Sequence, residues 1–282
     1  MPEAGRLLVC ATPIGNLGDV TLRVLDALRA ADVIVAEDTR VTRKLLARYD
    51  IHVRLERYDE ATAAVRTPEL VARIAGGERI VLVSDAGTPG ISDPGARLVD
   101  AALGAEVAVD VLPGPSAIIT ALVASGLPTH AFYFGGFLPR KPGERRRAIE
   151  ALAALDATLI FYESPHRTPA TVASIAAVLP GRRAAMAREL TKLHEEVLRG
   201  SVDEVARALE ARELKGEVVL LVGPPVPGER RAADEVAVRG RVDDFAARGF
   251  STKDAIKAVA TETGLGRNAV YRIVHGLSLI HI

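Results

Sequence analysis

Short apolar runs recur along the chain as far as Val222, and loops rich in Gly, Pro, Ser, Thr or Asp follow most of them. The run at residues 80–83, Ile-Val-Leu-Val, is continuous and β-branched. Such a run is typical of a strand buried on both faces of a parallel sheet. Between these runs the apolar residues take helical spacing, as at Leu22, Leu25 and Leu28, where Thr21 is the expected N-cap. Further strands of this first unit are expected at residues 6–11, 33–36 and 107–112.

This alternation of strands and helices predicts an α/β domain over residues 1–125. A parallel sheet of this kind collects its loops, and therefore its ligands, at the carboxyl ends of its strands. A second α/β domain is expected over residues 126–228, ending in a Pro/Gly linker at 223–228. In it, Ser201 and Glu204 form a capping box for a helix that reaches Arg212. Its strands are expected at residues 132–135, 158–162, 184–187 and 218–222.

The last unit, residues 229–276, has no convincing strand pattern. Ser251 is expected to start a helix that Gly264 breaks, and a second short helix follows at residues 268–275. Two short helices joined at a glycine are the helix-turn-helix pattern. From Arg239 to His275 there are seven Lys or Arg and four Asp or Glu, so this unit is locally basic and a candidate for RNA binding.

Composition limits the other function classes. The 282 residues carry 36 basic and 36 acidic side chains, so no overall charge favours nucleic acid. The single cysteine, Cys10, excludes an intramolecular disulfide or a cysteine-based zinc cluster, and no spacing of residues indicates a metal site. With no apolar run long enough to cross a membrane, we expect a cytoplasmic protein. Residues 277–282 match the translation of a sequencing adapter and are expected to be foreign to the fold; a genuine apolar tail is the alternative.

The loop at residues 84–94 has the strongest chemical character, with Asp85 at a strand tip and Gly87 and Gly90 able to approach a ligand. A tight turn with a capping Asp is the alternative interpretation. Gly15 and Gly18 match the last two glycines of a dinucleotide fingerprint, but Pro13 occupies the position of the first, which argues against a nicotinamide or flavin enzyme. No Walker A motif is present.

Seven motifs in register identify the chain as similar to the tetrapyrrole methylase superfamily, and within it to the enzymes that methylate ribosomal RNA. The motifs are Thr-Pro-Ile-Gly-Asn-Leu (12–17), Ala-Glu-Asp-Thr-Arg (36–40), Val-Ser-Asp-Ala-Gly-Thr-Pro (83–89), Leu-Pro-Gly-Pro-Ser (112–116), Phe-Tyr-Glu-Ser-Pro-His-Arg (161–167), Arg-Glu-Leu-Thr-Lys (188–192) and Lys-Gly-Glu-Val-Val-Leu (215–220).

The resemblance implies an S-adenosylmethionine cleft between the two α/β domains, a homodimer, and 2′-O-methylation of a cytidine in the decoding region of 16S ribosomal RNA. The RNA substrate would be the free small-subunit rRNA or the assembled 30S subunit. The cofactor-binding positions that it implies are Pro13, Ser84, Asp85, Thr88, Ser116, Ala117, Tyr162, Leu190 and Val218.

A ribose hydroxyl is a weak nucleophile, so a general base would assist its attack. Glu163 and His166 are the first candidates, and Asp38 with Arg40 the second, although structural pairing of Glu163 with Arg167 is an open alternative. A tetrapyrrole or other small-molecule methylase, or a metabolite-sensing nucleic-acid-binding regulator, also stays open. The candidate RNA contacts are Arg140, Lys141, Arg145, Arg146 and Arg147 in a basic loop at 139–147, and Lys253, Lys257, Arg267 and Arg272 in the last unit; a solvated helix start is the alternative for the loop.

Overall fold

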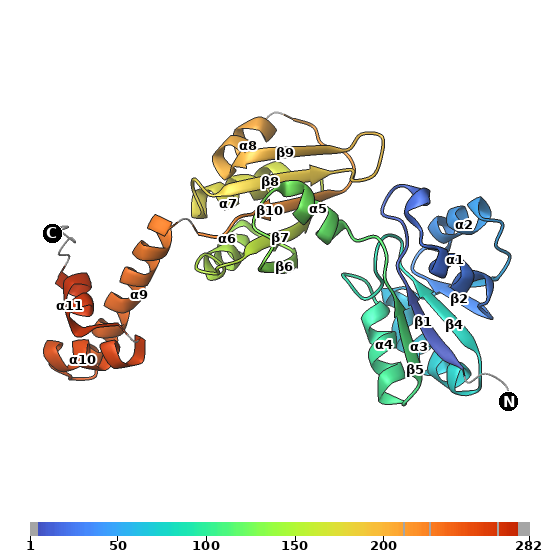
Figure 1. The fold of residues 1–282 in the computed structure, drawn as a ribbon, viewed down its shortest axis with the longest axis horizontal. Helices are drawn as coiled ribbons and strands as arrows, with labels where there is room; N and C mark the ends of the chain where they lie inside the picture. The colour runs from blue at the N-terminus through green and yellow to red at the C-terminus, as the bar shows by residue number, and fades with distance from the viewer. Residues whose placement is uncertain (1–4, 211, 226, 264, 276–282) are drawn as a thin grey trace.

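The computed structural model describes residues 5–275 except 211, 226 and 264. In these residues two five-stranded sheets lie one after the other along the chain, and a group of helices follows them (Figure 1). Of the sequence-based expectations, the adapter-like segment 277–282 and the helix break at Gly264 fall outside the described residues.

The first sheet is parallel throughout, with strand order β3-β2-β4-β1-β5. Apolar side chains are buried on both of its faces, which confirms that the continuous apolar runs form strands buried on both sides. Helices α1 and α2 cover one face, and α3 and α4 cover the other. Its elements are β1 (Arg6–Cys10), α1 (Leu22–Arg29), β2 (Val33–Ala36), α2 (Thr39–Arg48), β3 (Arg54–Arg57), α3 (Glu60–Ala75), β4 (Arg79–Val83), α4 (Gly95–Gly104) and β5 (Ala108–Leu112), with a short 3-10 helix η1 (Leu17–Asp19).

The second sheet is mixed, with strand order β6-β7-β10-β8-β9. β6 runs parallel to β7, whereas β10 is antiparallel to both β7 and β8. Helix α5 packs on one face, while α6, α7 and α8 pack on the other. Its elements are α5 (Ala117–Ser125), β6 (Phe132–Phe137), α6 (Pro142–Ala151), β7 (Thr158–Glu163), α7 (Thr168–Val178), β8 (Arg183–Arg188), β9 (Glu196–Ser201), α8 (Val202–Leu209) and β10 (Val218–Val222).

Helix α5 belongs to the second sheet by its packing. Ile118, Ala121 and Leu122 share one buried cluster with β7, β8 and β10. Arg183 and Arg199, from β8 and β9, donate hydrogen bonds to carbonyl oxygens at the end of α5. The chain therefore passes from the first sheet to the second before α5, although the sequence places the boundary after residue 125.

One helix prediction and one linker prediction are wrong. The helix after Ser201 has the expected capping box, but it ends at Leu209 and does not reach Arg212. The expected linker at 223–228 already contains the start of α9 (Pro227–Ala247), a long helix with little apolar periodicity in its sequence. Helices α10 (Thr252–Thr263) and α11 (Arg267–His275) follow and confirm the two short helices predicted for this unit.

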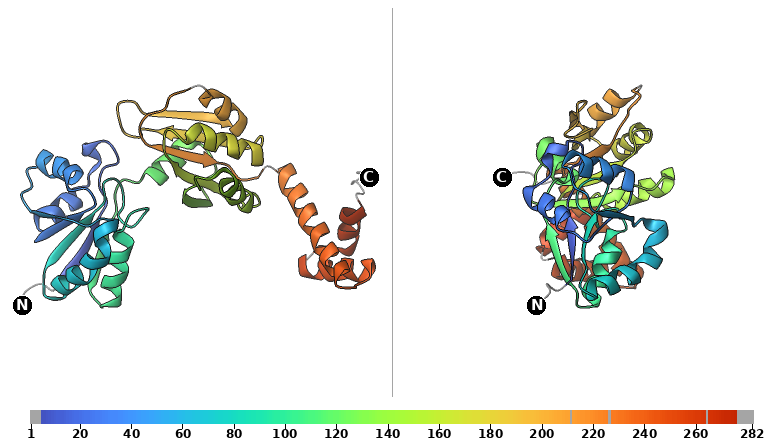
Figure 2. Two further views of the ribbon diagram at one scale, coloured as in Figure 1. Left: turned by 180° about the vertical axis from the view of Figure 1, so that it is seen from behind. Right: turned by 90° about the vertical axis from the view of Figure 1, so that its right-hand side faces the viewer.

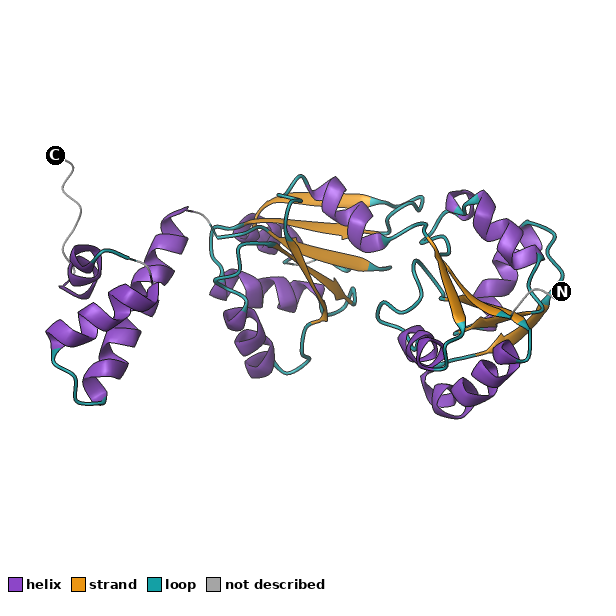
Figure 3. Cartoon of the chain, turned by 60° about the horizontal axis from the view of Figure 1, so that its bottom comes forward, coloured by secondary structure: helices purple, strands orange, loops and turns teal. Residues whose placement is uncertain are grey.

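Helices α9, α10 and α11 form a unit with its own small core. Val238 and Val242 of α9 pack against Val259 of α10 and Val270 of α11. Figure 2 shows this unit set apart from both sheets, and Figure 3 shows α9 leading away from the second sheet. Among the described residues, none of the helices combines the length and apolar character needed to cross a membrane.

Candidate active site

The loops that follow β1 and β4 are fastened to each other at the carboxyl edge of the first sheet. The backbones of Thr12 and Gly87 exchange two hydrogen bonds, of 2.9 and 3.0 Å. The Thr12 hydroxyl donates to the carbonyl oxygen of Ser84, and the Ser84 hydroxyl donates to the carbonyl oxygen of Gly87. Gly87 has φ of +77°, a conformation that favours glycine. These bonds hold the 84–88 loop in one shape.

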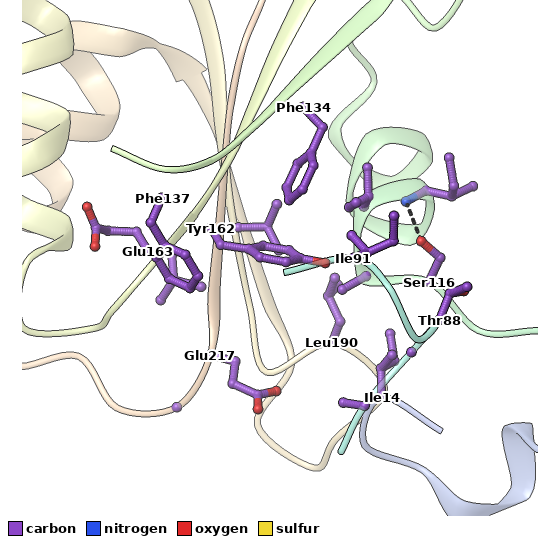
Figure 4. Close-up of a pocket in the computed structure, with 18 of the residues that line it drawn as sticks. Ile14, Thr88, Ile91, Ser116, Phe134, Phe137, Tyr162, Glu163, Leu190 and Glu217 are labelled. Atoms are coloured by element: carbon purple, nitrogen blue, oxygen red, sulfur yellow. Dashed lines mark hydrogen bonds between the residues drawn. The ribbon is translucent and has the colours of Figure 1, made fainter. Parts of the chain in front are cut away.

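A cavity of about 790 Å³ lies between this edge and the second sheet. Its size falls within the range of small-molecule and cofactor sites. The loops after β1 and β4, strands of the second sheet and the N-terminus of α5 line it (Figure 4). The wall is mostly apolar and aromatic, and its few polar side chains include Thr88, Ser116, Tyr162 and Glu217. Such a wall buries a flat organic ligand, while the few polar groups set its orientation.

The N-terminus of α5 forms part of the cavity wall. Ser116 is the N-cap, and its hydroxyl oxygen accepts a 3.5 Å hydrogen bond from the N–H of Ile119. Because a helix N-terminus carries a partial positive charge, this part of the wall suits a carboxylate or another anionic group.

Leu190 reaches the cavity from a constrained turn after β8. Its neighbours Glu189 and Thr191 both have positive φ, of +51° and +65°. Positive φ is rare for a β-branched residue such as threonine. The Thr191 hydroxyl oxygen accepts a hydrogen bond from the backbone N–H of Asn16, in the loop after β1. A side chain at Gly15 would not fit, because its Cβ would lie 2.5 Å from Lys192 Cγ. The turn is thus locked against the first sheet.

Charged groups lie beside this turn. The Lys192 ammonium donates to Glu189 Oε1 at 2.7 Å and to Glu217 Oε2 at 3.0 Å. Burial raises the pKa of Tyr162, and the nearby Glu217 carboxylate raises it further. Tyr162 is therefore a neutral hydroxyl donor in the wall.

Six of the nine predicted cofactor positions line the cavity: Thr88, Ser116, Ala117, Tyr162, Leu190 and Val218. Pro13, Ser84 and Asp85 do not. Ser84 is buried behind the loop that it braces. The Asp85 carboxylate accepts a 2.9 Å hydrogen bond from the backbone N–H of Asp38, and burial raises its pKa.

The structure does not place Glu163 as a free base. Its side chain is fully buried and its carboxylate accepts hydrogen bonds from the Thr171 hydroxyl (2.7 Å) and the Ser164 N–H (2.8 Å). Arg167 lies 3.2 Å from the same carboxylate, as the alternative interpretation of this residue predicted. In Figure 4 the carboxylate points away from Tyr162 and Ser116. His166 is exposed and does not line the cavity, although Ser164 and Pro165 of its turn do.

Asp38 and Arg40 form an exposed ion pair at the start of α2. The Asp38 carboxylate caps the helix and accepts hydrogen bonds from both the backbone and the guanidinium of Arg40. These bonds lower the pKa of Asp38 to about 2. Both side chains are engaged with each other at the start of α2, and neither residue lines the cavity.

The basic stretch at 139–147 is a helix start and not a loop, since α6 begins at Pro142. Arg145 is buried, and its guanidinium donates to the Ser174 hydroxyl at 3.0 Å, so its prediction as an RNA contact is wrong. The remaining predicted RNA contacts are exposed: Arg140, Lys141, Arg146, Arg147, Lys253, Lys257, Arg267 and Arg272.

Sequence reasoning missed the aromatic part of the wall. Phe132, Phe134 and Phe137 of β6 all line the cavity. The paired glycines Gly135 and Gly136 inside an aromatic strand were the available signal, because glycine inside a strand often marks a bulge. Within the described part of the chain there is no cluster of His, Cys, Asp or Glu that could hold a metal ion.

The cavity fits S-adenosylmethionine in its chemistry. An apolar, aromatic wall suits the adenine ring, and the hydroxyls of Ser116 and Thr88 with the α5 N-terminus suit the polar amino-acid part. Among the described residues that line the cavity there is no Lys or Arg, so no positive side chain in its wall opposes a sulfonium cation.

Fold and site together define a methyltransferase of the tetrapyrrole methylase type, and the comparisons with known proteins agree. The family model described as Tetrapyrrole (Corrin/Porphyrin) Methylases matches residues 6–206, and the chain belongs to this family. It is an enzyme that uses S-adenosylmethionine as methyl donor.

Curated relatives at high identity carry the name Ribosomal RNA small subunit methyltransferase I. The protein of Halalkalibacterium halodurans is 44% identical over 97% of this chain and 96% of its own length. That of Mesorhizobium japonicum is 46% identical over 96% of this chain and 92% of its own length. Among solved structures, the fold is similar to a uroporphyrin-III C-methyltransferase of Thermus thermophilus complexed with S-adenosylhomocysteine, with a TM-score of 0.56 and 18% identity over 78% of this chain and 97% of that one.

Proposed function

We propose that this chain transfers the methyl group of S-adenosylmethionine to the 2′-oxygen of a cytidine in the decoding region of small-subunit ribosomal RNA. The observation that carries the proposal is the extent of the similarity. The ribosomal RNA methyltransferase relatives match 96–97% of the chain, which includes the terminal helices. The uroporphyrin methyltransferase matches only 78% of it. A small-molecule methylase would leave the α9–α11 unit without a role.

The cofactor, in this proposal, occupies the cavity between the sheets. It supplies a sulfonium-activated methyl group, so the protein has mainly to align the acceptor oxygen with it. The 84–88 loop, the α5 N-terminus and the Leu190 turn form three sides of the site, and the Tyr162 hydroxyl is available as a donor. Pro13, Ser84 and Asp85 do not contact the cofactor in this proposal. They hold in place the loops whose neighbouring residues line the cavity.

His166 is our candidate for the general base, because Glu163 is already committed to three partners. His166 lies in an exposed turn whose neighbours Ser164 and Pro165 line the cavity, so bound RNA can reach it. General-base assistance contributes about 10²- to 10⁴-fold to rate. His166→Ala should therefore lower the single-turnover rate while the dissociation constant of S-adenosylhomocysteine stays unchanged. An unchanged rate would leave alignment as the whole mechanism.

The substrate is proposed to be free small-subunit rRNA or the assembled subunit, which also places the enzyme in the cytoplasm. Phosphates would contact the exposed basic side chains of α6, α10 and α11, since phosphate contacts position a nucleic acid without reading its sequence. A homodimer is proposed on the basis of apolar side chains left exposed on β5 and α5: Val111 is 58% and Val123 is 70% exposed. Sedimentation of the purified protein tests the dimer.

The methyl-transfer reaction is tested on small subunits and on free 16S rRNA from cells that lack this modification. Labelled methyl from S-adenosylmethionine should enter RNA on a cytidine ribose, as digestion and mass analysis would show. Ser116→Tyr, which fills the cavity, should abolish transfer, whereas Ser116→Thr keeps the helix cap and should retain it. Transfer to a tetrapyrrole and none to RNA would overturn the proposal in favour of a small-molecule methylase.

A further inference from the structure

The edge strand β6 leaves two large aromatic side chains exposed at the cavity. Phe132 is 45% exposed and Phe137 is 56% exposed, and both line the cavity. β6 is the outermost strand of the second sheet, so its free edge faces solvent. Scattered apolar side chains are normal on a surface, but two phenylalanines beside one cavity are a feature that calls for a ligand.

A bulge in β6 puts both phenylalanines on the same face. In a regular strand, side chains alternate, so Phe132 and Phe134 would share a face and Phe137 would point to the other. Phe134 pairs with Ile160 but Phe137 pairs with Tyr162, so two residues of β6 oppose one of β7. Bulges re-aim side chains next to functional sites.

Glycines make this bulge possible. Gly136 has φ of +60°, which favours glycine. A side chain at Gly135 would place its Cβ 2.7 Å from the ring of Phe161. The sequence Phe-Gly-Gly-Phe therefore encodes a strand that returns its last aromatic ring to the cavity side.

The result is an aromatic wall with an inner and an outer part. Tyr162 and Phe134 make an edge-to-face contact with centroids 4.9 Å apart, and Phe137 adds a tilted contact to Tyr162 at 5.8 Å (Figure 4). Tyr162 and Phe134 are half-buried, whereas Phe132 and Phe137 remain open to solvent. The inner rings belong to the cofactor cavity, and the outer rings are free for a second ligand.

Positive charge follows directly along the chain. Arg140 and Lys141 follow the Phe137 end of β6 after two residues, and both are exposed; Arg146 and Arg147 are exposed on α6, which packs on the opposite face of the sheet. Proteins hold single-stranded nucleic acid with bases stacked on aromatic rings and phosphates bound by cations; β6 supplies the rings, and Arg140 and Lys141 supply cations a few residues further along the chain.

We propose that Phe132 and Phe137 form a stacking platform for an unpaired pyrimidine base of the RNA substrate. The proposal rests on the proposed function and adds to it the place where the base lies. A ribose can bring its 2′-oxygen into a cavity only when its nucleotide leaves the base stack, and the displaced base then needs an apolar surface. Phe137 at the open rim provides that surface while the sugar enters.

A tryptophan reporter tests this placement directly, because the sequence contains no tryptophan. The fluorescence of Phe137→Trp should be quenched when an oligocytidylate is added to protein saturated with S-adenosylhomocysteine. Tyr133→Trp is the matched control, since Tyr133 is exposed on the same strand but does not line the cavity. Its fluorescence should not change. Equal quenching in both variants, or none in either, would overturn the platform.

Steady-state kinetics give a second, independent readout. Phe137→Ala and Phe137→Leu should raise KM for undermethylated small subunits about tenfold or more, in line with the loss of one base–aromatic stack. Phe137→Tyr should have a KM close to that of the wild type. The dissociation constant of S-adenosylhomocysteine should be the same in all three variants. If cofactor affinity falls instead, Phe137 belongs to the cofactor wall; if the oligomeric state changes with KM unaltered, β6 is a subunit contact. Either result overturns the proposal, whereas failure of the wild type to methylate RNA would overturn the proposed function separately.

Discussion

The hydroxyl oxygen of Thr191 accepts a 3.1 Å hydrogen bond from the backbone N–H of Asn16, and this bond joins the first sheet to the second beside the cavity. Asn16 follows β1, and Thr191 follows β8 in a turn with positive φ. The backbone of Gly15 is so close to this turn that a Cβ there would lie 2.9 Å from the carbonyl oxygen of Leu190. The width of the cavity is therefore set by two loops that are 175 residues apart in sequence.

Removing this bond should weaken cofactor binding. Thr191→Val keeps the shape of the side chain but has no acceptor, and a neutral hydrogen bond contributes about 0.5–1.5 kcal/mol. We expect the dissociation constant of S-adenosylhomocysteine to rise about two- to tenfold by calorimetry. Thr191→Ser keeps the acceptor and serves as control. If the valine and serine variants bind equally well, the bond does not set the geometry of the site.

Glu163 is expected to act in stability rather than in proton transfer. Glu163→Ala leaves the Arg167 guanidinium and the Thr171 hydroxyl without their partner, which should lower the free energy of unfolding by about 3 kcal/mol. Glu163→Gln keeps the volume and one acceptor, so it should lower the free energy of unfolding by less. Urea denaturation measures both.

The single-turnover rate of the glutamine variant separates the two roles of Glu163. A structural residue leaves the rate of the folded enzyme within a fewfold of wild type. A loss of two orders of magnitude or more in folded Glu163→Gln would instead identify Glu163 as the base.

The ion pair of Asp38 with Arg40 gives a pH dependence of defined sign. Hydrogen bonds from Arg40 lower the pKa of Asp38 from 3.8 to about 2 in the folded protein. Such a carboxylate stabilises the fold above pH 3.8, and this contribution is lost as the pH falls towards 2. Asp38→Asn should therefore show a shallower loss of stability than wild type between pH 4 and pH 2. Thermal melts over this pH range check this difference in stability, and Arg40→Gln serves as control. Parallel curves for wild type and Asp38→Asn would contradict the assignment.

The parts of this protein that the sequence predicts well are those in which both faces of a strand are buried. β2 and β10 read as unbroken apolar runs, and their bounds agree with the structure. The edge strands β3 and β9 were missed because their residues are largely polar and half-exposed. Helix α9 was missed because its sequence lacks a clear apolar stripe.

The candidate site was predictable only where a sequence motif lies at the end of a strand. Thr88, Ser116 and Leu190 lie in such motifs and line the cavity. What could not be read from the sequence is side-chain direction. Glu163 turns inward to Thr171 because the alternation of β7 places it on the helix-covered face. Phe137 turns towards the cavity because a bulge reverses that alternation in β6.

Docking of RNA by the terminal helices should appear in the salt dependence of binding. Lys253 and Lys257 of α10 and Arg267 and Arg272 of α11 are all exposed. Each phosphate contact contributes about 0.7 to the slope of log affinity against log salt for single strands, and about 0.9 for duplexes. Changing all four residues to Gln should therefore flatten the slope by up to about 3 for single strands and up to about 3.6 for duplexes, and should raise KM for small subunits.

A truncated chain separates docking from catalysis. Because α9 begins at Pro227, the cut belongs after Pro225, ahead of the helix. The described residues that line the cavity all lie between Ile14 and Val219, so this shorter chain should bind S-adenosylhomocysteine with nearly wild-type affinity. It should methylate small subunits poorly at physiological salt and recover in part at low salt, where the α6 cations are less screened. If it methylates as well as the full chain at every salt concentration, the α9–α11 unit does not dock RNA, and a change in sedimentation would then assign it to dimer formation.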